Sequence, residues 1–128
     1  MAKQEANITE AELEILQILW RNKLATVKDV HAEISKTREA GYTTVLKQMQ
    51  IMHEKGLLNR DSNQRQHIYS PVPDQQKVQR RFMDKLMKTV FGGSASQLVL
   101  QALSSYKTSE EELDEIKSLI KKVKNAKK

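Results

Sequence analysis

Residues 43–50 carry polar side chains that can form hydrogen bonds with the edges of DNA bases. Thr43, Thr44 and Lys47 fall on the side opposite the apolar residues when the segment is wound at about 100° per residue, and Gln48 and Gln50 are further candidates. The methyl group of threonine can contact thymine, and its hydroxyl can bond a base or a phosphate. Glutamine can bond adenine, and lysine can bond guanine or a phosphate. These residue types at this spacing are suited to reading the DNA sequence in the major groove. A solvated surface helix shows the same pattern, so both interpretations stay open for this segment alone.

The helix that must position these side chains is predicted at residues 42–55. Its buried stripe is Val45, Met49 and Met52, spaced i, i+4 and i+7. Gly56 fits the left-handed position just past a helix end. The helix therefore has one apolar side for a scaffold and one polar side for a ligand.

A two-strand ribbon is predicted directly after this helix, at residues 57–61 and 67–70. Arg65 in the connecting loop and His67 at the start of the second strand lie where a wing would meet the DNA backbone or the minor groove. An ordinary polar hairpin is the alternative. A helix followed at once by such a ribbon is the reading pair of a winged helix, so DNA binding becomes the leading hypothesis.

Two further helices are predicted ahead of this pair. Thr9 and Glu12 form a capping box that opens a helix at residues 10–22, and Thr26 with Asp29 indicates a second cap. We therefore expect a mainly α fold with a small two- to three-stranded β-wing, namely a winged helix-turn-helix followed by a C-terminal helical dimerisation segment.

The prolines at 71 and 73 end the ribbon, and we expect a DNA-binding domain at residues 1–72 and a helical dimerisation segment at 73–128. Leu113, Ile116, Ile120 and Val123 are spaced 3, 4, 3, a pattern that favours packing against a partner helix. We expect the lysine-rich tail to fray from residue 121. The expected dimerisation residues are Phe82, Leu86, Val90, Leu98, Leu113, Ile116 and Ile120.

The composition restricts the class of protein. With 128 residues the chain fits one domain, or one small domain plus an appended helical segment. Its 38% apolar content is low for a chain that buries its own core, and helices that complete their core in a partner subunit would explain it. The absence of cysteine excludes disulfides and thiolate metal sites. The polar residues 1–7 do not resemble a signal peptide and no apolar run is long enough to cross a membrane, so we expect a cytoplasmic protein. The three histidines lack metal-ligand spacing, and no nucleophile–base pair is evident, so neither a metal, a cofactor nor an enzymatic activity is expected.

The net charge of +6 permits a polyanionic partner without naming one. Residues 1–71 hold ten basic and nine acidic residues, so the predicted DNA-binding domain is nearly neutral. Within residues 36–67 the six cations outnumber three carboxylates, and this local balance favours phosphate. The cations are Lys36, Arg38, Lys47, Lys55, Arg60 and Arg65.

Several segments together resemble the penicillinase repressor family, which includes the methicillin-resistance and copper-transport repressors. Residues 8–12 with 18–20 resemble its opening, and residues 42–57 are similar to its recognition helix. His67-Ile68-Tyr69 resembles its closing wing strand, and residues 91–113 resemble its dimerisation segment. The order and spacing of these segments cover about residues 8–120.

The resemblance implies a homodimeric transcriptional repressor that reads an inverted-repeat operator on double-stranded DNA. In the penicillinase branch a membrane-bound sensor protease triggers a cut that corresponds to residues 91–97 here. Ser94-Ala95-Ser96 departs from the Asn-Phe pair of the β-lactam-responsive members, and the absence of cysteine departs from the copper-responsive ones. The alternative function is a winged-helix protein–protein interaction module without DNA readout, for which an apolar Ile51 on the polar side of the helix is a hint.

Overall fold

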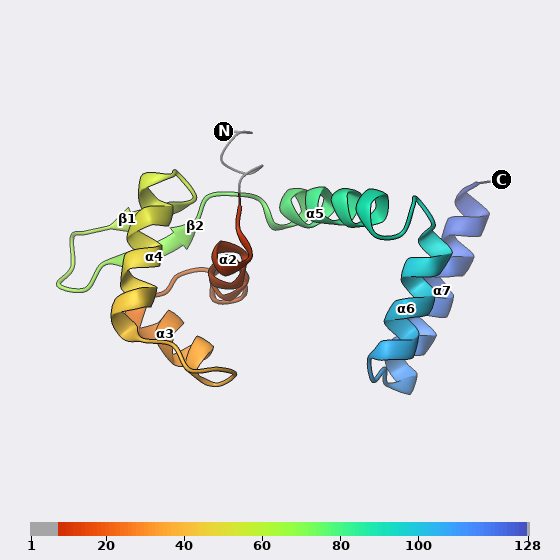
Figure 1. Ribbon diagram of the computed structural model, residues 1–128, viewed down its shortest axis with the longest axis horizontal. Helices are drawn as coiled ribbons and strands as arrows, with labels where there is room; N and C mark the ends of the chain where they lie inside the picture. Colours follow the sequence, from red (N-terminus) through yellow and green to blue (C-terminus); the bar gives the residue numbers. More distant parts are fainter. Residues whose placement is uncertain (1–7, 128) are drawn as a thin grey trace. The chain divides into compact units, whose positions relative to one another are not determined.

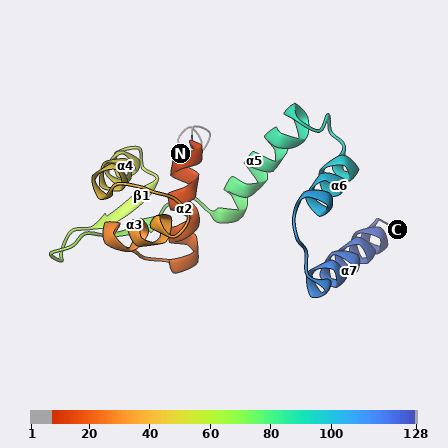
Figure 2. The same ribbon diagram turned by 60° about the horizontal axis from the view of Figure 1, so that its bottom comes forward.

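The computed structural model describes residues 8–127 (Figures 1 and 2). Residues 1–7, where no signal peptide is expected, and Lys128 of the tail lie outside the described residues. The described elements are α2 (Glu10–Asn22), α3 (Val27–Ser35), α4 (Tyr42–Glu54), β1 (Leu58–Asp61), β2 (Ile68–Pro71), α5 (Gln75–Thr89), α6 (Ala95–Ser105) and α7 (Glu110–Ala126).

The first two helices begin at the predicted capping boxes. The Thr9 hydroxyl accepts from the Glu12 amide at 3.1 Å, and the Glu12 carboxylate accepts from the Thr9 amide at 2.9 Å. Thr26 and Asp29 make the same reciprocal pair at 3.1 Å each. These bonds satisfy amides that a helix start otherwise leaves without partners, so the sequence sets both start positions.

The ribbon is a two-stranded antiparallel sheet in which Leu58 pairs with Pro71 and Asp61 with Ile68. Each strand begins one residue later than predicted. The Leu57 amide does not join the ribbon because it closes α4 by donating to the Met52 carbonyl at 2.9 Å, whereas the Leu57 carbonyl accepts from the Val72 amide at 2.9 Å. Gly56, at φ 83°, lies between the end of α4 and Leu57, and its amide donates to the His53 carbonyl at 3.1 Å. The pair of bonds donated by these two amides is a Schellman motif.

The chain from α2 to β2 forms one winged helix around a common core. Ala25 extends the sheet, since its amide and carbonyl exchange hydrogen bonds with those of Tyr69 at 3.0 and 2.8 Å. The Trp20 indole donates to the Pro73 carbonyl at 3.0 Å and ties α2 to the segment before α5. The buried core residues are Ile8, Ile15, Leu16, Ile18, Leu19, Ala25, Val27, Val30, Ile34, Val45, Met49, Met52, Leu57, Leu58, Tyr69 and Val78.

The chain divides into two compact units between Met83 and Asp84, within α5. Val78 in the first half of α5 belongs to the winged-helix core, and Phe82 packs partly against it. The expected boundary at residues 72/73 marks the end of the sheet. It stays a prediction about which segment binds DNA and which one dimerises.

The second unit contains the end of α5 together with α6 and α7. Gly92 and Gly93 follow α5 with φ of 56° and 83°, a backbone region that favours glycine. The Ser94 hydroxyl then caps α6 by accepting from the Gln97 amide at 3.2 Å. Neither α6 nor α7 has a buried residue. The expectation that the tail frays from residue 121 is wrong, because α7 extends to Ala126.

Candidate nucleic-acid interface

The helix α4 has the two-sided character that its sequence predicts. Val45, Met49 and Met52 are at most 4% exposed and anchor the helix in the core. Four of the five polar candidates on α4 are exposed, and they are Thr43, Thr44, Lys47 and Gln50. Because the buried stripe fixes the rotation of the helix about its axis, these side chains form one solvent-facing surface, which we call the α4 face.

Gln48 lies at the edge of this face, and Ile51 lies within it. Gln48 is half-buried, since at about 100° per residue it falls only about 60° from Val45. Ile51 is 38% exposed and lies beside Thr44, one heptad earlier on the helix. The α4 face therefore contains an exposed apolar side chain among its polar ones.

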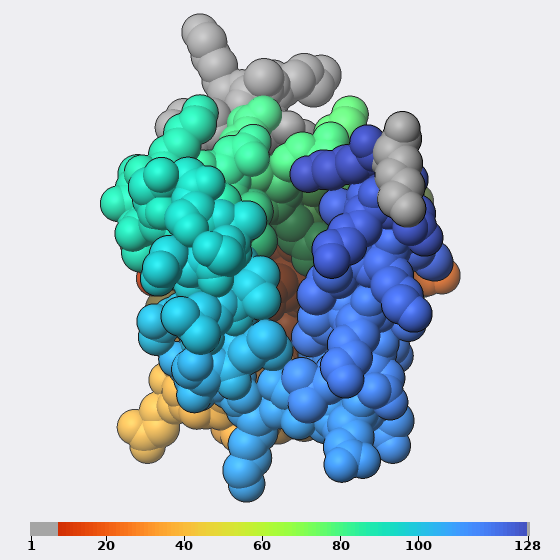
Figure 3. Space-filling model, turned by 90° about the vertical axis from the view of Figure 1, so that its right-hand side faces the viewer, coloured from red at the N-terminus to blue at the C-terminus, as the bar shows by residue number. Residues whose placement is uncertain are grey.

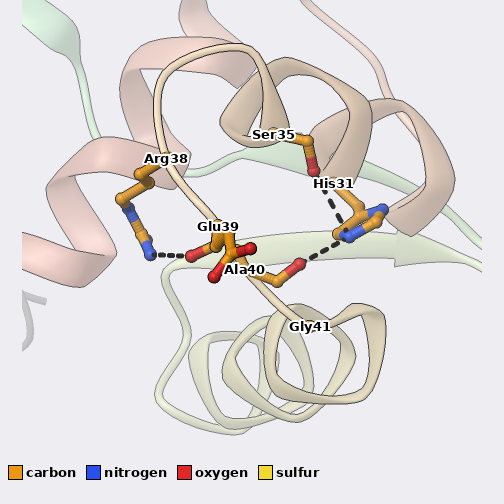
Figure 4. Close-up of a pocket in the computed structure, with 6 residues that line it drawn as sticks. All are labelled: His31, Ser35, Arg38, Glu39, Ala40 and Gly41. Atoms are coloured by element: carbon orange, nitrogen blue, oxygen red, sulfur yellow. Dashed lines mark hydrogen bonds between the residues drawn. The ribbon is translucent and has the colours of Figure 1, made fainter.

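The turn before α4 is held by His31 of α3 (Figure 4). Its Nε2 donates to the Ala40 carbonyl at 2.7 Å, and its ring meets the Tyr42 ring edge-on with 5.7 Å between centroids. Gly41, the N-cap of α4, supplies no side-chain cap. His31 therefore positions the first turn of α4.

The far end of α4 is held by a partly buried ion pair. Lys55 Nζ lies 2.9 and 2.8 Å from the two carboxylate oxygens of Glu12, which is 2% exposed. The same carboxylate completes the capping box of α2. The start of α2 and the end of α4 are thus fixed to each other through one buried group.

The turn that precedes α4 is also tied to α2, through Arg38 and Glu14. Arg38 donates to both Glu14 oxygens at 3.2 and 2.7 Å. This hydrogen bond, assisted by the guanidinium charge, lowers the pKa of Glu14 and raises that of Arg38. Both residues are partly or fully exposed, so the pair contributes mainly to the geometry of the turn.

The structure corrects the local charge argument. Of the six cations between residues 36 and 67, Lys36 pairs with Glu33, Arg38 with Glu14 and Lys55 with Glu12. Their charge is largely neutralised within the domain. Among the described ion pairs none involves the other three cations, and these are Lys47, Arg60 and Arg65.

A hollow of about 220 Å³ brings the wing together with the starts of two helices. We call it the wing hollow. Arg65 and His67, both exposed, line it from the wing, and their contact with DNA stays a prediction. Lys28 and Tyr42 line it too, although neither was singled out in the sequence. The full lining is Thr26, Val27, Lys28, Tyr42, Leu46, Arg65, Gln66, His67 and Tyr69.

The predicted dimerisation residues lie on α5, α6 and α7. Phe82 packs partly on the winged-helix core, whereas Leu98 and Ile116 are half-exposed. The other four, Leu86, Val90, Leu113 and Ile120, are 41%, 63%, 37% and 51% exposed. Figure 3 shows one face of the second unit, over which the surfaces of α6 and α7 are open to solvent.

The described residues show neither a metal site nor a membrane span. No group of three His, Cys, Asp or Glu side chains within residues 8–127 is arranged to hold a metal ion. Within the same residues, no helix combines the length and apolar character needed to cross a bilayer.

Comparison with known proteins places the chain among repressors. The penicillinase repressor of Bacillus licheniformis is 26% identical over 126 residues, which are 98% of each chain. The methicillin resistance regulatory protein MecI of Mammaliicoccus sciuri is 21% identical over 122 residues, 95% of this chain and 99% of that protein. The solution structure of the DNA binding domain of the repressor BlaI aligns with a TM-score of 0.49 and 29% identity over 54% of this chain and 84% of that one.

The family model for the penicillinase repressor matches residues 8–122, which include every element from α2 to most of α7. That range agrees with the segments whose order and spacing resemble the family. The chain therefore belongs to the penicillinase repressor family, a family of transcriptional repressors and not of enzymes.

Proposed function

We propose that this protein is a homodimeric transcriptional repressor that binds an inverted-repeat operator on double-stranded DNA. The observation that carries the proposal is the α4 face, where Thr43, Thr44 and Lys47 stand exposed on a helix that is fixed at both ends. A helix fixed in this way can insert into the major groove without losing much conformational freedom. Its relatives include proteins described as penicillinase repressors.

Sequence readout and affinity come from different residues in this proposal. Thr43, Thr44 and Gln50 provide contacts to base edges, with Gln48 at the edge of the face. Lys47 and Arg65 bind phosphates or guanine, and His67 lies near the backbone. Because several cations are already paired within the domain, we expect few phosphate contacts and a moderate dependence of affinity on salt.

Dimerisation brings two α4 faces onto successive major grooves about one helical turn apart. The exposed apolar side chains of the second unit support this step, because α6 and α7 bury no residue within the single chain. Leu113, Ile116 and Ile120 recur along one side of α7 with the spacing of a helix–helix interface. The full set also includes Phe82, Leu86, Val90 and Leu98.

We further propose that a cut near residues 91–97, made in response to a sensor protease, releases the repressor. The segment covers the turn between α5 and α6 together with the first residues of α6, and it consists largely of exposed residues. A break there separates the winged helix from most of α6 and from α7, so that each winged helix must bind its half-site without the partner subunit. The cytoplasm, where the DNA is, is the proposed location.

A mobility-shift titration tests the proposal. The purified protein is titrated on the DNA upstream of its own gene with scrambled competitor, at two salt concentrations. Saturable, competitor-resistant and salt-sensitive retention is expected. Equal weak retention on both DNAs contradicts the proposal.

The exposed Ile51 favours one other function, a winged-helix module that binds proteins through the α4 face. An apolar side chain at the centre of a protein interface contributes to affinity without regard to salt. Salt-insensitive binding to another protein, with no retention of DNA, would favour this alternative.

A further inference from the structure

We propose that the wing hollow binds one phosphate of the DNA backbone in each half-site, and that Lys28 is its principal cationic ligand. This inference rests on the proposed function and adds a residue to it. The hollow is lined by residues from the start of α3, the start of α4 and the wing. A phosphate held there fixes the domain along the DNA before any base is read.

The charge of the lining suits an anion. Lys28 and Arg65 contribute full cations from α3 and the wing, and Gln66 and His67 add hydrogen-bond donors. None of the nine lining residues is acidic. Among the ion pairs of residues 8–127, none involves Lys28 or Arg65, so no carboxylate of that part of the chain pairs with either charge.

The size of the hollow argues against a small organic ligand. At about 220 Å³ it is smaller than the roughly 300–1,000 Å³ of pockets that enclose such molecules. A phosphodiester needs only to be approached from one side by two or three donors, as exposed side chains around a shallow hollow allow. The chemistry therefore favours a phosphate of a polymer that continues past both ends of the hollow.

The position of Lys28 does not stabilise α3, the helix that carries it. Lys28 lies in the first turn of α3 beside the capping residue Asp29, and the positive end of the helix dipole disfavours a cation there. The same dipole favours an anion beside it. A phosphate in the wing hollow turns this unfavourable placement into a favourable one.

The test compares two matched lysines in the full-length protein. Lys28→Gln removes the charge at the hollow, whereas Lys77→Gln removes one in the first turn of α5, outside the lining. Binding to operator and scrambled DNA is titrated over a range of salt. For Lys28→Gln we expect weaker binding to both DNAs by similar factors, with the salt slope reduced by about 2 per dimer. Lys77→Gln should retain the wild-type slope.

A methylphosphonate scan of the operator locates the contact. Neutralising one phosphate per half-site should weaken the wild type several-fold at a particular position and leave Lys28→Gln nearly unaffected there. Equal behaviour of the two lysine variants, or equal losses for wild type and Lys28→Gln at every position, overturns the assignment of the hollow. Failure of the wild-type protein to prefer its operator overturns the proposed function as well, and the two results are distinguishable.

Discussion

Replacing Lys55 by methionine should destabilise the winged helix more than any exposed lysine replacement. Methionine has a similar length and helix propensity, so the change removes mainly the charge. Glu12 is 2% exposed, and without Lys55 its carboxylate keeps only the Thr9 amide among its described side-chain hydrogen bonds. A buried carboxylate left without its cation is costly because it stays desolvated without a compensating charge.

The magnitude follows from the exposure of the two partners. Breaking a fully buried ion pair costs about 3–5 kcal/mol. The Lys55 side chain is 32% exposed, so solvent screens part of the interaction and we expect about 2–3 kcal/mol. Lys36→Met is the matched control. It breaks a pair with Glu33 whose side chains are 68% and 31% exposed, and it should cost about 0–1 kcal/mol.

The assay is urea unfolding followed by the fluorescence of Trp20, the single tryptophan of the chain, at one fixed protein concentration. The double variant Glu12→Gln, Lys55→Met should recover part of the loss, because no uncompensated charge then remains buried. If Lys55→Met lowers the free energy of unfolding no more than Lys36→Met does, the ion pair does not fix the end of α4 and the reasoning is refuted.

Three further predictions concern pH, readout and assembly. Arg38 lowers the pKa of Glu14 below 4.5, so the pair stabilises the fold above that pH, and this contribution is lost as the pH falls through the lowered pKa. In thermal unfolding, the difference in stability between wild type and Arg38→Gln should therefore shrink between about pH 6 and pH 3. A difference that stays constant over this range would contradict the prediction. Thr44→Ala should reduce the preference for operator over scrambled DNA several-fold in competition titrations, whereas equal loss on both DNAs would assign Thr44 to the backbone. Leu113→Asp should give monomers in sedimentation, unlike Ser118→Asp on the opposite side of α7, and a dimeric Leu113→Asp protein would remove this position from the interface.

The parts of the fold that were predictable depend on local interactions. Both capping boxes and the glycine after α4 act within a few residues, so the helix boundaries could be read from Thr9, Thr26 and Gly56. The buried stripe of α4 follows from periodicity alone. The first residue of β1 was predicted one position too early, because the Leu57 amide closes the preceding helix by donating to the Met52 carbonyl instead of joining the sheet.

The parts of the site that were not predictable depend on contacts between distant residues. Lys55 and Glu12 are 43 positions apart, and Arg38 and Glu14 are 24 apart, so counting local charges overstated the cations available to DNA. Lys28 joins Arg65 and His67 only because the fold brings the start of α3 to the wing. A lysine in the first turn of a helix, where its charge is unfavourable, was the signal in the sequence that could have indicated it.

The proposed dimer accounts for the many exposed apolar side chains of the second unit in a chain with only 38% apolar residues. Val90, Leu100 and Tyr106 are 63%, 60% and 75% exposed, more than solubility favours in a monomer. In the proposed account these residues and the apolar side of α7 are covered by a second copy of the chain. We therefore expect that loss of that cover, by mutation or by a cut between α5 and α6, weakens binding to paired half-sites without altering the α4 face.

Hydroxyl-radical footprinting of the full-length protein on the DNA upstream of its own gene tests the central claim most directly. A dimeric operator-binding repressor predicts two protected segments related by an inverted repeat and centred about one helical turn apart, or a multiple of it. The same DNA with Leu113→Asp protein should lose both segments together. Absence of protection at concentrations that retain the DNA, or protection without paired half-sites, would contradict the account.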